Sequence, residues 1–230
     1  MTDQTKVVIE VVGEGKTDVG LTKNPDESKQ PRAPQEGVIP ILVNWLCGKP
    51  DAMLVKRHPY STLQGKTREQ KVHFAKRQAL YNRSAGVVFV VDSEGDLKGR
   101  TQELTRGRDR AYPEYPMAIG VAHPCVESWL LADAAAIRLG LGLATTPNVP
   151  DEPEHLPAPC KNAQDNPKSV LRRISGVQRK EISAEAKHRI AIAMNDMALV
   201  RERCPESFAP FADEVTQHIH PLFRKPCSPA

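Results

Sequence analysis

Residues 86–96, GVVFVVDSEGD, decide the fold of this chain. Five apolar residues, four of them valines, run without a polar interruption into an acidic tip. Such a run is typical of a strand that is buried on both faces of a parallel sheet. Side chains that carry out chemistry collect at the carboxyl ends of such strands. The stretch therefore predicts a central parallel strand that ends on Asp92, Glu94 and Asp96.

The sequence around this strand alternates between strand-like and helix-like segments. Apolar and β-branched residues predict further strands over 6–12, 53–57 and 116–122. The spacing of apolar residues predicts helices over 37–47, 65–83 and 97–110, and the polar segment 21–36 is expected to be a loop. This order predicts an α/β fold with a four-stranded parallel sheet flanked by helices and joined by right-handed crossovers.

The second half of the chain is expected to be mainly helical. A helix is predicted over 125–141, and further helices over 168–178, 183–204 and 205–221. Six prolines between residues 145 and 167 exclude a regular helix or strand there and indicate an extended linker or insertion. The expected division is an α/β domain over 1–140, a proline-rich segment over 141–167 and a helical extension over 168–230.

The composition is that of an ordinary globular protein, with 26% charged and 40% hydrophobic residues and a formal net charge of +4. A positive charge this small permits contact with nucleic acid without arguing for it. No run approaches the ~20 apolar residues of a membrane span, and the first residues lack the pattern of a signal peptide, so no membrane partner is expected. The five cysteines include no C-x-x-C pair, which favours reduced thiols in a cytoplasmic protein.

A further acid follows the first predicted strand. Glu14 stands in the turn GEGKTD, between Gly13 and Gly15. Because the ends of parallel strands meet at one edge of a sheet, Glu14 is expected near Asp92 and Glu94. Carboxylates that converge without cations repel each other, and a hard cation such as Mg²⁺ (or Mn²⁺) relieves this repulsion. The alternative is that these acids are solvated turn residues, which are common in loops.

The turn GEGKTD is not one of the glycine-rich motifs that bind phosphate. A P-loop needs a glycine where Glu10 stands, and a dinucleotide-binding fingerprint needs one where Asp18 stands. Lys16 is therefore expected to contact a substrate phosphate only as a single cation.

Several strings resemble those of one protein family. GEGKTD at 13–18 resembles the E-G-x-[ST]-[DE] motif of TOPRIM domains, which occur in topoisomerases, primases and OLD-type nucleases, and VVDSEGD resembles their D-x-D motif. HPCVESWLLAD at 123–133, NPKSVL at 166–171 and CPESFAPF at 204–211 resemble strings of a TOPRIM-like group of bacterial proteins, the DUF4276 group. The resemblance covers nearly the whole chain.

The resemblance implies a TOPRIM-like sheet and a set of site residues. Glu14 matches the catalytic glutamate of the family, and Asp92 matches its first metal-binding aspartate. Glu94 takes the place of the second aspartate, a departure that changes the geometry of the metal site. The resemblance further implies nuclease-like chemistry with a separate ATPase subunit as a partner, and a role in phage defence or genome maintenance.

Two residues at the same edge have two interpretations each. Glu127 lies in the first turn of a predicted helix, where it either completes the metal site or favours the helix dipole. Asp96, two residues after Glu94, is expected to be a further ligand of the metal. His123 precedes a proline at a strand end, where it either assists proton transfer and binds phosphate or has a structural role. Cys125 is adjacent, and is either a nucleophile or a buried thiol.

The cations offer two candidate surfaces for a phosphate backbone. Arg100, Arg106 and Arg108 follow the acidic tip and are expected to bind substrate phosphate. The basic residues of the predicted helix 65–83 either track a nucleic-acid backbone or form the solvated face of that helix.

These features predict Mg²⁺-dependent cleavage of a nucleic-acid phosphodiester. An alternative is a catalytically weak subunit of an ATPase complex that binds nucleic acid or a partner. A third is a nucleotidyl transferase of primase type, which would need a nucleoside triphosphate.

Overall fold

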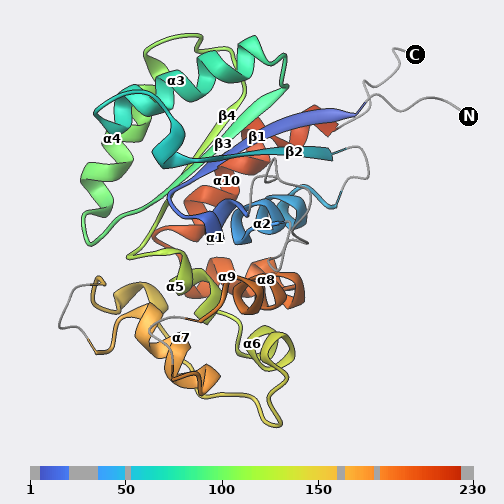
Figure 1. Cartoon of the computed structure of the whole chain (residues 1–230), viewed down its shortest axis with the longest axis vertical. Helices are drawn as coiled ribbons and strands as arrows, with labels where there is room; N and C mark the ends of the chain where they lie inside the picture. Colours follow the sequence, from blue (N-terminus) through green and yellow to red (C-terminus); the bar gives the residue numbers. More distant parts are fainter. Residues whose placement is uncertain (1–5, 21–35, 50–52, 160–163, 179–181, 224–230) are drawn as a thin grey trace, which may run out of the picture.

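The computed structural model of the protein describes residues 6–20, 36–49, 53–159, 164–178 and 182–223, without the side chains of Lys16 and Thr17 (Figure 1). The loop expected over 21–36 lies outside the described residues, except for Glu36.

Four parallel strands form the centre of the molecule, as the sequence predicted. They are β1 (Val7–Gly13), β2 (Met53–Pro59), β3 (Gly86–Asp92) and β4 (Met117–Ala122), in the order β2-β1-β3-β4. β1 and β3 are neighbours in the middle of the sheet, with Val11 opposite Val88. The loops that follow these two strands therefore begin side by side at one edge of the sheet.

Helices cover both faces of the sheet (Figure 1). On one face α3 (Arg68–Tyr81) and α4 (Leu97–Asp109) pack through Val72, Ala75 and Leu104 against Phe89. On the other face lie α1 (Lys16–Val19), α2 (Val38–Leu46) and α10 (Phe208–His218). The described residues also form three short 3₁₀ turns, η1 (Tyr60–Thr62), η2 (Pro153–His155) and η3 (His220–Phe223).

The C-terminal helix α10 packs closely on β4. A methyl group added to Gly120 of β4 would lie 2.6 Å from the ring of Phe211, so only glycine allows this approach. Phe211 also stacks on Trp129, with ring centroids 5.1 Å apart and an interplanar angle of 11°. Helix α10 therefore completes the core on this face of the sheet.

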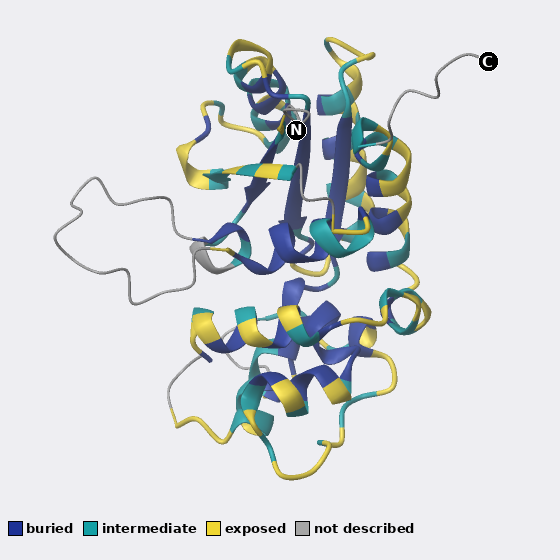
Figure 2. Ribbon diagram, turned by 90° about the vertical axis from the view of Figure 1, so that its right-hand side faces the viewer, coloured by how far each residue is buried: buried dark blue, intermediate teal, exposed yellow. Residues whose placement is uncertain are grey.

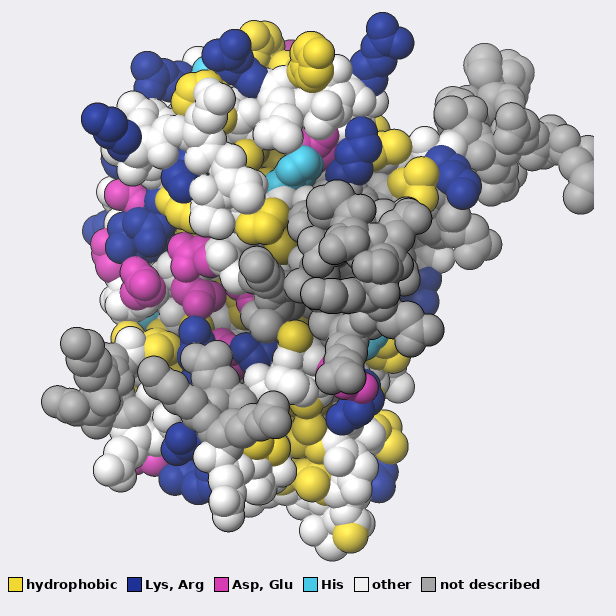
Figure 3. Space-filling view, viewed as in Figure 1, with side chains coloured by type: hydrophobic (Ala, Val, Ile, Leu, Met, Phe, Trp, Pro, Cys, Tyr) yellow, Lys and Arg dark blue, Asp and Glu magenta, His cyan; other side chains and the backbone are white. Residues whose placement is uncertain are grey.

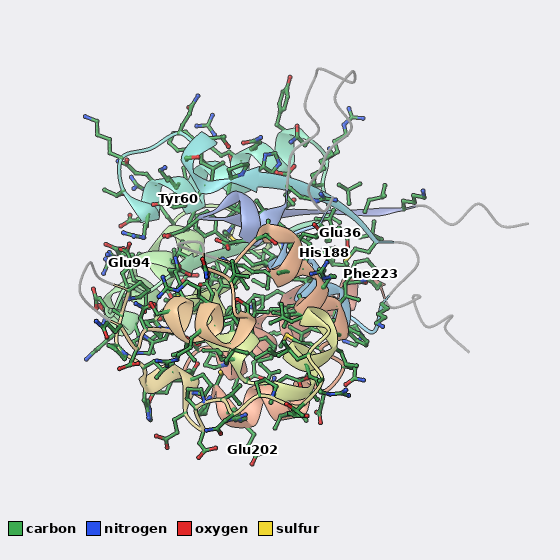
Figure 4. All side chains as sticks on the ribbon, turned by 60° about the horizontal axis from the view of Figure 1, so that its bottom comes forward. Glu36, Tyr60, Glu94, His188, Glu202 and Phe223 are labelled. Atoms are coloured by element: carbon green, nitrogen blue, oxygen red, sulfur yellow. The ribbon has the colours of Figure 1, made fainter. Side chains whose placement is uncertain are left out.

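The other helices form a layer beyond the end of β4, below the sheet in Figures 1 and 2. They are α5 (Val126–Leu131), α6 (Ala134–Leu141), α7 (Pro167–Ser175), α8 (Ala184–Ala193) and α9 (Met197–Arg203). Hydrophobic residues of this layer and of the sheet belong to one core. His188 of α8 lies beside Glu36, and its Nδ1 is 2.9 Å from the carbonyl oxygen of that residue (Figure 4).

Two helices that the sequence predicts as continuous are each broken at an aspartate. The predicted helix over 125–141 is α5 and α6, and the carboxylate of Asp133 accepts a hydrogen bond of 2.8 Å from the backbone N–H of Ala136. The predicted helix over 183–204 is α8 and α9, where Asp196 caps the backbone N–H of Leu199 at 3.0 Å. Each aspartate starts a new helix because its side chain competes for the backbone donors.

The described part of the proline-rich segment is packed against the C-terminal helices. The turn Pro153–His155 brings Glu154, 2% exposed, to the loop before α10. Glu154 accepts hydrogen bonds of 2.8 Å from the backbone N–H groups of Glu206 and Ser207, and Arg203 donates to backbone carbonyls of the same segment. The division at residues 140 and 167 stays a prediction, but these contacts cross it.

Within the described residues, no helix has both the length and the apolar character that crossing a membrane requires.

Candidate active site

The loops after β1, β3 and β4 meet at the carboxyl edge of the sheet. The loop after β3 remains bonded to the end of β4, because Ser93 N–H donates to Ala122 at 2.8 Å and Glu94 N–H donates to Pro124 at 3.1 Å. Glu94 has a positive φ of 52°, a conformation that a glutamate rarely adopts, in the tight turn that leads to α4. These bonds fix the acidic tip predicted from residues 86–96 against the start of α5.

Asp92 is the last residue of β3, and it lies partly buried between the sheet and the start of α5. Its Oδ1 accepts a hydrogen bond of 3.1 Å from the backbone N–H of Val126, the first residue of α5. Burial raises the pKa of Asp92 well above its ordinary value, and the nearby carboxylates of Asp18, Glu127 and Glu14 raise it further. The ionised form of Asp92 is therefore poorly stabilised by the protein alone.

Glu14 lies on the loop after β1 and shares this property. Burial raises the pKa of Glu14, the guanidinium of Arg68 opposes that effect, and Glu94 and Asp18 add to it. Two carboxylates from neighbouring central strands thus both hold a proton more readily than in water.

Arg68, the first residue of α3, lies between the acids. Its Nη2 is 3.6 Å from Glu14 and 3.7 Å from Glu94. Arg100 of α4 makes a second set of contacts, at 3.7 Å to Glu94 and 3.2 Å to Glu103. Acidic side chains gather with basic ones next to them on one side of the face in Figure 3, and Glu94 and Tyr60 lie on the same side of the molecule in Figure 4. The site is therefore a mixed cluster and not a purely acidic one.

Glu127 is buried in the first turn of α5, the position that the sequence predicted. Its Oε1 lies 2.5 Å from Nζ of Lys187, on α8, and both side chains are under a tenth exposed. Burial favours the neutral acid, but Lys187 and Lys168 outweigh it and hold the pKa of Glu127 below its ordinary value. Glu127 is thus an ionised member of a buried ion pair that joins α5 to α8.

His123 and Cys125 follow β4 at the same edge. Nδ1 of His123 and the Ser93 hydroxyl share a hydrogen bond of 2.7 Å, and the His123–Pro124 peptide bond is cis. Within the described residues, the other ring nitrogen of His123, Nε2, makes no hydrogen bond. Burial raises the pKa of the Cys125 thiol well above its ordinary value, which leaves the nucleophile interpretation without support.

Three predicted site residues make other contacts within the protein. Asp96 caps α4, where its carboxylate accepts a hydrogen bond of 2.9 Å from the backbone N–H of Gly99. Arg106 and Arg108 are in the last turn of α4, and that helix carries them away from the strand ends. They pair there with Glu69 and Glu214, respectively. The predicted phosphate contact of Lys16 lies outside the described side chains.

The basic cluster predicted on the helix 65–83 is largely engaged within the protein. Lys76 is fully buried, with Nζ 2.8 Å from the carbonyl oxygen of Arg108. Lys71 donates to the carbonyl oxygen of Tyr60 at 3.1 Å. Arg68 belongs to the acidic site, which leaves Lys66, Arg77 and Arg83 as the exposed cations of this stretch.

Four residues act on the site although the sequence did not predict them as part of it. Asp18, which ends the GEGKTD string, lies close enough to Asp92 to raise its pKa. Arg68, Lys168 and Lys187 are the cations that act on Glu14, Asp92 and Glu127. The strings that resemble the TOPRIM-like group contain Asp18 and Lys168, so that signal was present in the sequence.

Glu14 and Asp92 are the predicted metal ligands that follow the two neighbouring central strands. Within the described part of the chain, no three or more histidine, cysteine, aspartate or glutamate side chains are arranged to hold a metal ion. Mg²⁺ is often held by only one or two carboxylates together with water and substrate oxygens. Burial is the main cause of the raised pKa values of Glu14 and Asp92, and neighbouring carboxylates add to it, so a nearby cation would favour the ionised form of both. Glu94, whose side chain is 62% exposed, contacts two arginines instead.

Comparisons with known proteins assign neither a family nor a function to the chain. No family model matches it, and no significant match is found among curated proteins or solved structures.

Proposed function

We propose that this protein cleaves a phosphodiester bond of nucleic acid with the help of Mg²⁺ (or Mn²⁺). The observation that carries the proposal is the pair Glu14 and Asp92, which extend from adjacent central strands and both have raised pKa values. Polar sites at the carboxyl edge of a parallel sheet are where α/β proteins place their chemistry. Perturbed carboxylates in such a position are candidates for metal binding and catalysis.

The chain supplies each role that this reaction needs. Glu14 and Asp92 would hold the cation, which when bound neutralises charge on the phosphate and lowers the pKa of water. Glu14 has a raised pKa and can accept a proton from the attacking water. Arg100, which contacts Glu94, and Lys168, whose charge lowers the pKa of Asp92, would bind phosphate oxygens, and Nε2 of His123 would hydrogen-bond to the substrate.

The contacts of Arg68 also favour a second function. A guanidinium that already faces Glu14 and Glu94 would suit a protein that keeps this fold without turnover. The second candidate is therefore a binding subunit for nucleic acid or for a partner such as a separate ATPase.

The deciding experiment compares Asp92→Asn with Asp96→Asn. Both replace an aspartate by its amide, but Asp96 caps α4 and asparagine is an equally good cap. We expect Asp92→Asn to lower Mg²⁺-dependent cleavage of single-stranded or supercoiled DNA, or of RNA, by about a hundredfold or more. Asp96→Asn should cleave like the unmodified protein.

Circular dichroism confirms that both variants are folded before the comparison is made. Equal cleavage by Asp92→Asn and the unmodified protein would refute the assignment of Asp92. An absence of metal-dependent cleavage in all three proteins, with nucleic-acid binding intact, would favour the binding subunit.

A further inference from the structure

Arg68 is a cation at the centre of the site, and its role there rests on the proposed function. The guanidinium faces carboxylates from three segments: Glu14 after β1, Glu94 after β3 and Glu103 on α4, at 3.6, 3.7 and 3.9 Å, respectively. Its side chain is only 20% exposed. Arg68 is therefore positioned to neutralise part of the negative charge of Glu14 and Glu94.

The backbone at Arg68 is fixed by the start of α3. Thr67 and Gln70 form a capping box: the Thr67 hydroxyl accepts from the Gln70 N–H at 3.2 Å, and the Gln70 side chain accepts from the Thr67 N–H at 3.4 Å. These bonds hold the backbone at the helix start, while the long side chain of Arg68 can still rotate about its own bonds.

The contacts of Arg68 are longer than those of Arg108, another partly buried arginine in the same chain. Arg108 binds the carboxylate of Glu214 with two hydrogen bonds of 2.8 Å, the geometry of a tight ion pair. The contacts of Arg68 are all longer than a hydrogen bond, and its Nε is buried without a hydrogen-bond partner in the described part of the chain. Its donors are thus only partly used by the protein.

We infer that Arg68 balances the charge of Glu14 and Glu94 in the metal-free protein, and that it rotates to bind a substrate phosphate when a divalent cation takes over the carboxylates. The planar guanidinium matches two phosphate oxygens at once, which a lysine ammonium cannot do. The same side chain then competes with the metal in the absence of substrate and binds substrate in its presence.

The inference predicts opposite effects of Arg68→Gln on two ligands. Mn²⁺ alone, followed by electron paramagnetic resonance, should bind about fivefold or more tightly, because a competing charge is removed. A short fluorescent single-stranded oligonucleotide, measured in Ca²⁺ to suppress cleavage, should bind more weakly by about tenfold. The slope of log affinity against log salt should become shallower by about one phosphate contact.

Two further variants separate this role from a structural one. Arg68→Lys keeps the charge, so we expect its Mn²⁺ affinity to stay near that of the unmodified protein while oligonucleotide binding weakens. Arg110→Gln removes an arginine that pairs with Glu69 outside the site, and should change neither affinity. If Arg68→Gln does not fold, Arg68→Lys alone still supports or refutes the phosphate contact.

The outcomes distinguish this inference from the proposed function. Equal Mn²⁺ affinity in the unmodified protein and Arg68→Gln, or an unchanged oligonucleotide affinity in both Arg68 variants, would overturn the role of Arg68 and leave the nuclease proposal intact. No Mn²⁺ binding by either protein would overturn both. Mn²⁺ binding that appears only in Arg68→Gln would support the competition directly.

Discussion

At the scale of single residues, the raised pKa of Asp92 makes the stability of the fold depend on pH. Burial and the carboxylates of Asp18 and Glu127 raise its pKa, so the folded protein binds a proton that the unfolded chain releases at lower pH. The free energy of unfolding therefore falls as the pH rises from the unfolded pKa of about 4 through the higher folded pKa, and the loss persists above it. A bound cation would reverse this loss.

Asp92→Asn should consequently stabilise the metal-free protein at neutral pH. The amide oxygen can still accept the hydrogen bond from Val126, and the unfavourable charge is gone. We expect the melting temperature to rise by about 2–4 °C near pH 7, the shift that 1 kcal/mol produces in a chain of this size, and the gain to shrink toward about pH 5. Thermal melts of both proteins across this range in a chelating buffer measure it. A gain that is the same at every pH would contradict the assigned pKa shift.

The ion pair of Glu127 and Lys187 gives the opposite dependence on pH. The lowered pKa of Glu127 means that its ionised form stabilises the fold above the unfolded pKa of about 4.3, and that this stability is lost as the pH falls through the lower folded pKa. At neutral pH the pair is fully ionised and buried.

We expect Glu127→Gln and Lys187→Met each to lower the free energy of unfolding by about 3–5 kcal/mol, because each leaves an unpaired buried charge. The double variant should lose clearly less than the sum, since it removes both charges. Urea denaturation of the four proteins gives the coupling energy directly. A loss of only about 0.3–1 kcal/mol in Glu127→Gln would instead mark a simple helix-start acid.

At the scale of elements, local patterns predicted the strands and missed the helix breaks. The valine run of β3 is a local signal, and it predicted the strand that ends at Asp92. The apolar pattern continues across Asp133, so a periodicity analysis extends one helix through the point where the aspartate caps a new one.

The cations of the site depend on packing between distant segments. Glu14 and Asp92 could be predicted because they follow strands directly. Lys187 could not, because nothing in its own sequence neighbourhood indicates that α8 packs against α5. Arg106 and Arg108 were expected beside the acidic tip because they are near in sequence, whereas the helix rises about 1.5 Å per residue away from it.

Because the segment around Glu154 is packed, we expect the substitution Glu154→Ala in this proline-rich stretch to lower the free energy of unfolding clearly. Glu154→Ala would leave the buried N–H of Ser207 without its acceptor, at about 1–3 kcal/mol, and would also remove the acceptor of the Glu206 N–H. Glu152→Ala, in the same stretch, removes a side chain that is 73% exposed and should change stability by about 0.5 kcal/mol or less. Urea denaturation of the two variants compares them. Equal stability of the two variants would mean that the contacts of Glu154 do not stabilise the fold.

At the scale of the whole molecule, a bound nucleic acid could contact either end of α4, and each end carries an arginine that tests one of these two binding surfaces. Arg100 is near the strand ends and contacts Glu94, whereas Arg106 is at the far end and 60% exposed. We expect Arg100→Gln to weaken oligonucleotide binding and to make the salt slope shallower by about one, and Arg106→Gln to change neither. Salt titrations in Ca²⁺ test both variants. A larger effect of Arg106→Gln would move the binding surface to the outer face of α4.

The packing of α10 on β4 has a consequence for synthesis on the ribosome. β4 is complete at residue 122, but the helix that covers its face begins at residue 208. Translation at ~5–20 residues per second leaves an interval of about 4–17 s in which Ala118 and Gly120 have no helix above them. A nascent-chain chaperone would find its apolar target on that face, and a premature stop codon before α10 would release a chain in which the face is never covered.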